Sequence, residues 1–169
     1  MRCDVTLSSK GITKLIKDLE KYKKSLTRLT KEFQKKLGEA GVEECKARVS
    51  YIPADYELDE VTVTYQLKDN TVYIYMSGKE AVFIEFGAGV IHNGPIGTSL
   101  HPKGEELGLV IGSYPGQTHA DSPHGWYYTD ENGVKHRSKG NPAFAPLYLT
   151  EIYLMTNAAR IAKEVFGHG

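Results

Sequence analysis

The sequence predicts an α+β fold, in which a small antiparallel β-sheet packs against a long N-terminal helical segment and a C-terminal helix, with a long irregular central loop. Apolar residues recur at helical spacing near both ends of the chain, and β-branched residues alternate with polar ones within 60–77. Residues 87–124 are rich in Gly, Pro and His and have little periodicity. The length of 169 residues suits one domain, which we expect to cover 1–169.

Composition predicts an ordinary globular protein. Hydrophobic residues make up 40% of the chain and charged residues 25%. The two cysteines, Cys3 and Cys45, lack metal-ligand spacing and are too few for a disulfide framework, which favours a reducing compartment. The sequence has no signal-peptide pattern at its start and no apolar run of about 18 residues. We therefore expect a cytosolic protein with no membrane partner.

The N-terminal region predicts a short strand and then a long helix. Residues 2–7 alternate polar and apolar side chains, and Ser8 and Ser9 can cap a helical segment over 8–50. Gly38 and Gly41 weaken this helix and predict a bend or break. Its apolar residues alternate spacings of three and four: Ile12, Leu15, Leu19, Tyr22, Leu26, Leu29 and Phe33. Such a heptad stripe indicates an amphipathic helix packed on its own fold, which we favour, or a seam against another subunit.

Positive charge is concentrated in the same segment. Residues 8–48 contain twelve Lys or Arg and six Asp or Glu, although the whole chain has no net charge. This asymmetry is compatible with a nucleic-acid-binding module that uses the basic helix. Mixed Lys and Glu on a helix more often form a solvated face, which we favour.

The centre of the chain predicts a hairpin followed by a short helix. Two alternating β-branched runs flank the turn residues 68–70 and predict a β-hairpin over 60–77. Ser77 and Glu80 have the spacing of a capping box, and Gly87 suits a left-handed residue after a helix. We therefore expect a short helix over 78–86.

The second half begins with the irregular segment and ends in a helix. We expect a loop over 87–124 that becomes ordered when it meets a partner, with one possible short strand at 107–111. A second hairpin is predicted over 125–138 around an Asn-Gly turn. After a proline-marked hinge, apolar residues at spacings of three and four predict a helix over 146–166. This helix is so apolar that most of it should be covered.

Catalytic chemistry has weak support in the sequence. His119, Asp121 and His124 are residue types that bind metals, so a metal-dependent hydrolase using loop histidines is an alternative. No HExxH, GxSxG, P-loop, CxxC or dinucleotide motif is present. Glu85 lies among apolar residues and suits either a general base or an acceptor for N–H groups of the following glycine loop. We favour the second role, and expect no enzyme and no cofactor.

Several segments in this order resemble a known family. They are EFGAG at 85–89, an HP-containing glycine loop, WYY at 126–128 and a PAxAPLY hinge before the last helix. Together with the long charged helix and the hairpin, they resemble the minor morphogenesis proteins of tailed bacteriophages, also described as tail-completion or head–tail joining proteins. The chain is especially similar to versions from prophages of Gram-positive bacteria, and the likeness covers residues 5–166.

The resemblance implies a structural virion protein at the phage neck. It implies a homo-oligomeric ring, with a hexamer as the expected form, between the portal-proximal connector and the tail tube or tail terminator. DNA would pass through this ring only as cargo. The protein would be in the host cytoplasm during assembly and in the virion neck or tail afterwards. The expected assembly or interaction residues are Glu85, Phe86, Gly87, Gly89, His101, Pro102, Trp126, Tyr127, Pro142 and Pro146.

Overall fold

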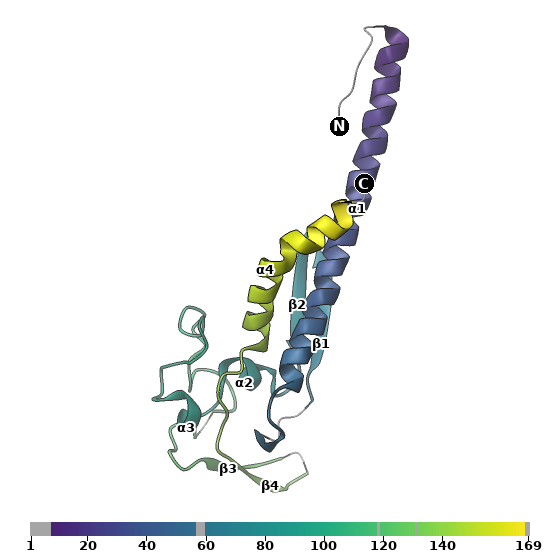
Figure 1. The fold of residues 1–169 in the computed structure, drawn as a ribbon. Coiled ribbons are helices and arrows are strands. Elements are labelled where there is room, and N and C mark those ends of the chain that lie inside the picture. Colours follow the sequence, from purple (N-terminus) through teal and green to yellow (C-terminus); the bar gives the residue numbers. More distant parts are fainter. Residues whose placement is uncertain (1–7, 57–59, 118, 131, 168–169) are drawn as a thin grey trace.

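The computed structural model describes residues 8–56, 60–117, 119–130 and 132–167. The strand expected over 2–7 lies outside the described residues. The described chain is an α+β fold with a long first helix, two antiparallel hairpins and a long last helix (Figure 1). Its elements are α1 (Ser9–Ser50), η1 (Ala54–Tyr56), β1 (Thr62–Lys68), β2 (Thr71–Ser77), α2 (Ala81–Phe86), α3 (Val90–Asn93), β3 (Trp126–Thr129), β4 (Lys135–Ser138) and α4 (Pro146–Phe166).

Helix α1 is continuous over 42 residues. The Ser8 hydroxyl caps it by accepting the Gly11 N–H at 3.1 Å. The break expected at Gly38 and Gly41 is wrong, because α1 continues through both residues. Both glycines instead serve packing between α1 and the first hairpin. A Cβ at Gly38 would overlap the Tyr65 ring, and one at Gly41 would lie 2.7 Å from Ile74 Cδ1. The missing side chains let the hairpin approach the helix axis closely.

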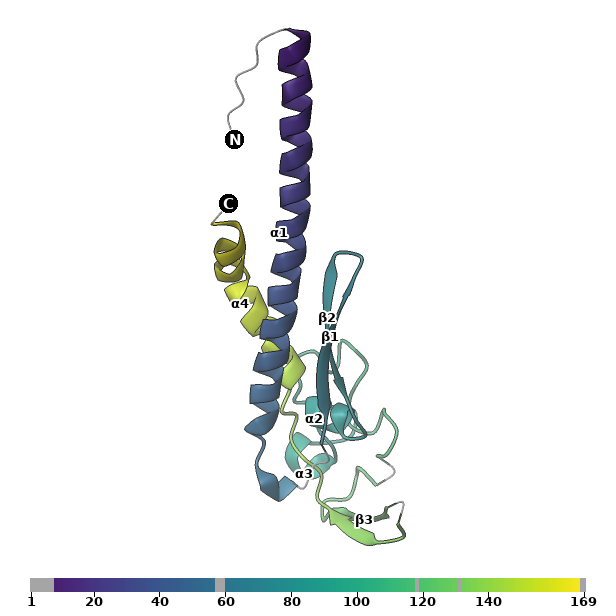
Figure 2. The same ribbon diagram turned by 90° about the vertical axis from the view of Figure 1, so that its right-hand side faces the viewer.

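The antiparallel strands form two separate hairpins. β1 pairs with β2 from Thr62↔Ser77 to Lys68↔Thr71, and β3 pairs with β4 from Trp126↔Ser138 to Thr129↔Lys135. The two pairs form separate two-stranded sheets. The first hairpin lies along α1, and α4 runs obliquely across α1, so that its C-terminal end lies on the side away from the hairpin (Figure 2).

The short helix α2 is present, but the capping box expected to start it is wrong. Ser77 is the last residue of β2, and the helix begins at Ala81 with Glu80 as N-cap residue and no side-chain cap bond. Gly87 follows α2 with φ 84° and ψ 170°. This positive φ suits glycine, but the ψ value is not that of the expected left-handed residue.

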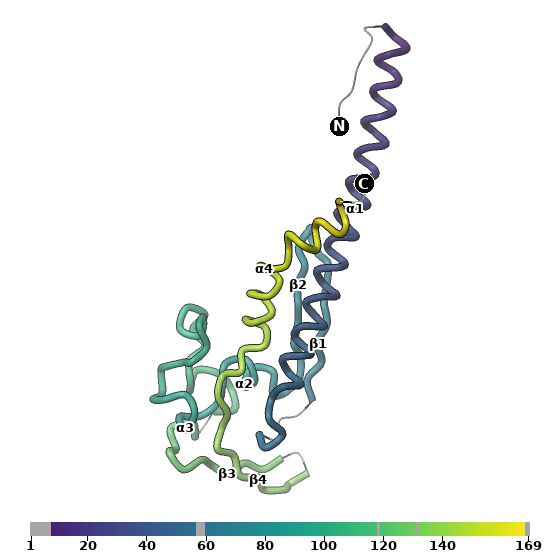
Figure 3. The backbone as a smooth tube through the Cα atoms, in the orientation of Figure 1, coloured from purple at the N-terminus to yellow at the C-terminus, as the bar shows by residue number. Residues whose placement is uncertain are grey.

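Segment 87–124 lies beside α2 and the second hairpin, at the end of the molecule away from the start of α1 (Figure 3). It is irregular, as expected, apart from the one-turn helix α3. The short strand expected at 107–111 is wrong, because this stretch consists of turns and coil. Ile111, Tyr114 and Ala120 are buried, so the segment contributes apolar side chains to a core.

Helix α4 packs across the second half of α1. The rings of Phe33 and Phe166 meet at its C-terminal end with centroids 5.9 Å apart. The N-terminal half of α1 extends beyond this contact (Figure 1). Helix α4 is covered only in part, because Met155 is 70% exposed. No helix in the described ranges is both long and apolar enough to span a membrane.

Candidate assembly site

Glu85 lies at the centre of a buried polar junction. The residue is 4% exposed, and its carboxylate accepts the backbone N–H groups of Leu147 and Tyr148 at 2.8 and 2.9 Å. These N–H groups belong to the first turn of α4, where helical N–H groups lack partners within the helix. A carboxylate there also interacts favourably with the positive end of the helix dipole. Glu85 of α2 therefore caps α4 from a distance of more than 60 residues in sequence.

His101 completes the shell of donors around Glu85. Its Nε2 lies 2.9 Å from Glu85 Oε1, and its Nδ1 accepts the Lys103 N–H at 3.1 Å. Since Nδ1 accepts a hydrogen bond, the proton of the neutral ring is on Nε2, which donates to the carboxylate. Both partners have their hydrogen bonds satisfied in a buried place. This arrangement is typical of a structural polar network.

Asn93 and Asn141 tie the EFGAG segment to the chain before α4. Asn93 Nδ2 donates to the carbonyls of Asn141 and Gly89 at 2.7 and 3.0 Å, and its Oδ1 accepts the Ala143 N–H at 3.2 Å. Asn141 Nδ2 donates to the Phe83 carbonyl at 2.7 Å. The two asparagine side chains therefore add hydrogen bonds where the two segments already pair through an antiparallel β-bridge between Ala88 and Asn141.

Gly87 and Gly89 are required by the same junction. Both have positive φ, 84° and 73°, and both are closely approached. A Cβ at Gly87 would lie 2.6 Å from Asn93 Oδ1, and one at Gly89 would lie 2.7 Å from the Trp126 ring. The carbonyl of Gly87 accepts the hydroxyl of Tyr114, and burial raises the pKa of this tyrosine to about 12. The glycine motif therefore has a packing role.

The structure corrects the role expected for Glu85. Its carboxylate accepts the N–H groups of α4 instead of those of the glycine loop. Four other predicted assembly residues are also buried, Gly87, Gly89, His101 and Pro146. These five residues shape the fold, and in this conformation a partner cannot reach most of their surface.

The remaining predicted residues lie nearer the surface. Pro102 and Tyr127 are exposed, and Tyr127 is 69% accessible on β3. Phe86, Trp126 and Pro142 are half-buried. The Phe86 ring packs at a tilt against the ring of His101, with centroids 4.5 Å apart. Of the ten residues, Tyr127 and Pro102 are the ones best placed to contact a partner.

The N-terminal half of α1 carries five large apolar residues that no other element of the described chain covers. We call this surface the apolar stripe, and each of its residues is between 45% and 52% exposed. Its members are Ile12, Ile16, Leu19, Tyr22 and Leu26. The heptad repeat to which the apolar stripe belongs continues to Phe33, and the ring of Phe166 in α4 covers the ring of Phe33. Helix α1 therefore packs on its own fold where the heptad reaches Phe33, and its apolar stripe before that point is left uncovered by the described residues.

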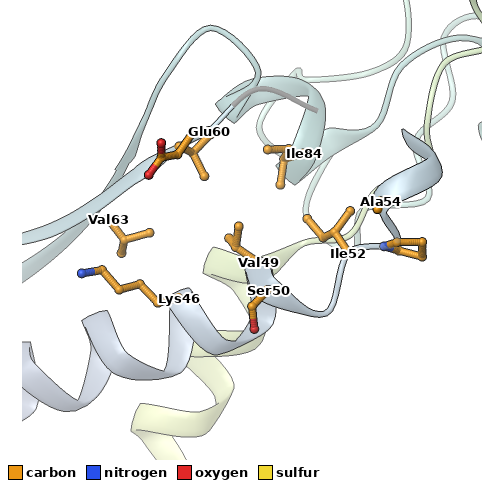
Figure 4. Close-up of a pocket in the computed structure, with 10 residues that line it drawn as sticks. Lys46, Val49, Ser50, Ile52, Ala54, Glu60, Val63 and Ile84 are labelled. Carbon is orange, nitrogen blue, oxygen red and sulfur yellow. The ribbon is translucent and has the colours of Figure 1, made fainter. Parts of the chain in front are cut away.

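Two hollows flank the buried junction. One, of about 610 Å³, lies between the end of α1, the following connector, the start of β1 and Ile84 of α2 (Figure 4). Its labelled walls are mostly apolar, with Lys46 and Glu60 at the rim. The other, of about 380 Å³, lies over Glu85 and His101 and is bordered by Lys103 and Glu151, which form an ion pair at 2.8 Å.

The histidines considered for a metal site do not form one cluster with the neighbouring acids. Within residues 8–56, 60–117, 119–130 and 132–167, no group of three or more His, Cys, Asp or Glu side chains is placed to hold a metal ion. His119, Asp121 and His124 are exposed or partly exposed on the loop surface. His136 instead bonds Asp130 at 3.0 Å, which lowers the pKa of this carboxyl group.

Sequence reasoning missed the two asparagines of the junction and the exposure of Ile16 and Met155. The Asn-Pro pair at 141–142 was a usable signal, because asparagine before proline often organises a turn. Ile16 falls beside the heptad positions and widens the stripe.

Comparison of the chain with models of protein families, with curated protein sequences and with solved structures found no significant match. The likeness to phage morphogenesis proteins therefore rests on the motifs of the sequence.

Proposed function

We propose that this protein is a structural assembly protein of a tailed bacteriophage neck, which joins or completes the head–tail interface as a homo-oligomeric ring. Its neighbours would be the portal-proximal connector and the tail tube or tail terminator. The EFGAG and NPAFAPLY segments support this proposal through their resemblance to that family. The structure adds that these two segments bind each other in one buried junction.

The observation that carries the proposal is the apolar stripe. Five large apolar side chains about half exposed on a projecting helix are unfavourable in water. Burying the remaining surface of each would contribute about 1 kcal/mol, since full burial of such a side chain contributes about 1.5–3 kcal/mol. A second copy of the helix offers a matching stripe of the same length. Self-association therefore covers this surface without a further partner.

Cyclic symmetry fits the charges beside the stripe. In a ring, equivalent helices have the same direction along the axis, so neighbouring α1 helices can pack in parallel. With Ile12 and Leu19 at heptad position a, Asp18 falls at g and Lys23 at e. Parallel packing brings g of one helix to e of the next, which pairs these opposite charges. The apolar Ile16 at another e position widens the contact.

The experiment compares the oligomeric state of matched variants. Light scattering after size-exclusion chromatography should give an oligomer for the wild type, and electron microscopy should show rings. Leu19→Lys with Leu26→Lys should give monomers. The control pair, Thr13→Lys with Thr27→Lys, adds the same charge beside the stripe and should stay oligomeric.

A second measurement tests the place of the ring. Labelled antibody against the protein should mark the neck of tailed particles assembled with it. A monomeric wild type, equal assembly of both lysine pairs, or particles without the protein at their neck would contradict the proposal.

A further inference from the structure

A second regular stripe, made of positive charges, follows the outer face of α1. We call it the basic stripe, and its spacings alternate four and three over the whole row. Every member is exposed. It consists of Lys10, Lys14, Lys17, Lys21, Lys24, Arg28, Lys31 and Lys35. Its length follows from the helical rise of 1.5 Å per residue and is about 38 Å.

The basic stripe lies opposite the apolar stripe. At 100° per residue, the centres of the two stripes are roughly 170° apart around the helix. Contacts made through the apolar stripe therefore leave the cations facing outward. The two stripes suit two different partners.

Acidic side chains neutralise this row only in part. Residues 9–36 contain ten Lys or Arg and three Asp or Glu. Among the residues that the structure describes, two members of the stripe form ion pairs, Arg28 with Glu32 at 3.5 Å and Lys35 with Glu39 at 3.6 Å. Both pairs are exposed, and such pairs contribute little. Their cations can therefore exchange these partners for a stronger anion.

We propose that the basic stripe binds the phosphate backbone of duplex DNA independently of base sequence. Duplex DNA carries about one negative charge per 1.7 Å of its axis, a continuous line of charge that matches an unbroken row of cations. Seven of the eight cations are lysines, which act as point charges on phosphates and lack the planar fork that reads guanine. This inference goes beyond the ring, because a single helix presents the whole row.

An anionic membrane surface fits the same helix less well. A helix that lies in a bilayer surface must bury its apolar face there, while its Lys and Arg occupy the opposite, polar face. In the proposed oligomer the apolar stripe is covered by a second copy of α1. No apolar face of this helix is then left to enter the bilayer.

The test measures binding of the full chain to a fluorescent DNA duplex longer than the stripe, by anisotropy at increasing salt. If six to eight cations contact phosphates, affinity should fall by about 10³-fold or more between about 50 and 200 mM salt. Two duplexes of different sequence should bind equally. The quadruple variant Lys14→Gln, Lys17→Gln, Lys21→Gln, Lys24→Gln should lower the slope of log affinity against log salt by about 3–4.

The matched control removes four exposed lysines outside the stripe: Lys46→Gln, Lys68→Gln, Lys135→Gln and Lys139→Gln. It should leave the salt slope unchanged. Circular dichroism and light scattering should show that both quadruple variants keep their helix content and oligomeric state. A change in DNA binding can then be distinguished from a change in ring formation.

Four outcomes of the binding measurements would overturn the proposal, and a fifth comes from the oligomeric state. They are no salt-dependent DNA binding by the wild type, equal loss in both quadruple variants, strong preference for one sequence, and binding to phosphatidylserine vesicles with none to DNA. If the stripe variant loses its oligomeric state and keeps its DNA affinity, the basic stripe binds the acidic surface of another copy instead.

Discussion

Glu85 and His101 form a buried hydrogen bond of 2.9 Å, with side chains 6% and 3% exposed. The same carboxylate accepts two N–H groups from the start of α4, so one side chain connects α2, the irregular segment and the last helix. An acidic residue that suits either a general base or a backbone acceptor in the sequence is therefore a helix cap inside the core.

We expect Glu85→Ala to lower the free energy of unfolding by about 3 kcal/mol or more. The substitution leaves two helical N–H groups and the His101 ring without their buried acceptor. Glu151→Ala is the control, because this exposed carboxylate on α4 pairs with Lys103 at the surface and should cost less than about 1 kcal/mol. Urea unfolding at one protein concentration measures both. Equal losses would show that the Glu85 network contributes no more than a surface pair.

Gly38→Ala should destabilise the protein, although alanine favours a helix by about 1 kcal/mol. The added methyl group would overlap the Tyr65 ring, and overpacking in a core typically costs about 1–3 kcal/mol. The neighbouring exposed substitution Glu39→Ala should change stability by less than about 0.5 kcal/mol. Thermal unfolding followed by circular dichroism compares the two. A higher melting temperature for Gly38→Ala would contradict the close contact between helix and hairpin.

Asn93→Asp should destabilise the junction most at neutral pH. The new carboxylate would face the carbonyls of Gly89 and Asn141, to which the asparagine amide now donates. As pH falls and this group gains a proton, part of the lost stability should return, because the protonated form can donate again. Asn157→Asp on α4 lies beside Arg160 and serves as control, with a small effect. Unfolding by urea at several pH values measures the difference. A loss that does not depend on pH would count against the role of the amide as a donor.

Cys45 should be protected from thiol reagents in the folded protein. It is fully buried, and burial raises the pKa of its thiol above the ordinary value. A raised pKa favours the neutral thiol in the native state, so its contribution to stability is present below the pKa of the unfolded chain and is lost as pH rises through the native pKa. In a Cys3→Ser variant, reaction with an aromatic disulfide at pH 8 should occur only after unfolding in urea. Rapid labelling of the native protein would contradict this burial.

The sequence by itself determined the helices and hairpins, because each depends on neighbours that are close in the chain. Repeats of three and four residues locate α1 and α4, and alternation around an Asp-Asn turn locates β1 and β2, where Asp69 and Asn70 have the positive φ of a tight turn. Local signals were misleading where distant segments meet. The low helix propensity of Gly38 predicts a break in α1, and the spacing of Ser77 and Glu80 predicts a capping box. The structure has neither.

Only the tertiary structure decided which residues are buried and which are exposed. Glu85 meets the N–H group of Leu147 across 62 positions, and no local pattern records such a contact. Likewise, the heptad of α1 runs without a break from Ile12 to Phe33, and the length and placement of α4 determine that its cover reaches only to Phe33. The open apolar stripe beyond that point, and the basic stripe opposite it, arise because one helix extends further than the elements that pack on it.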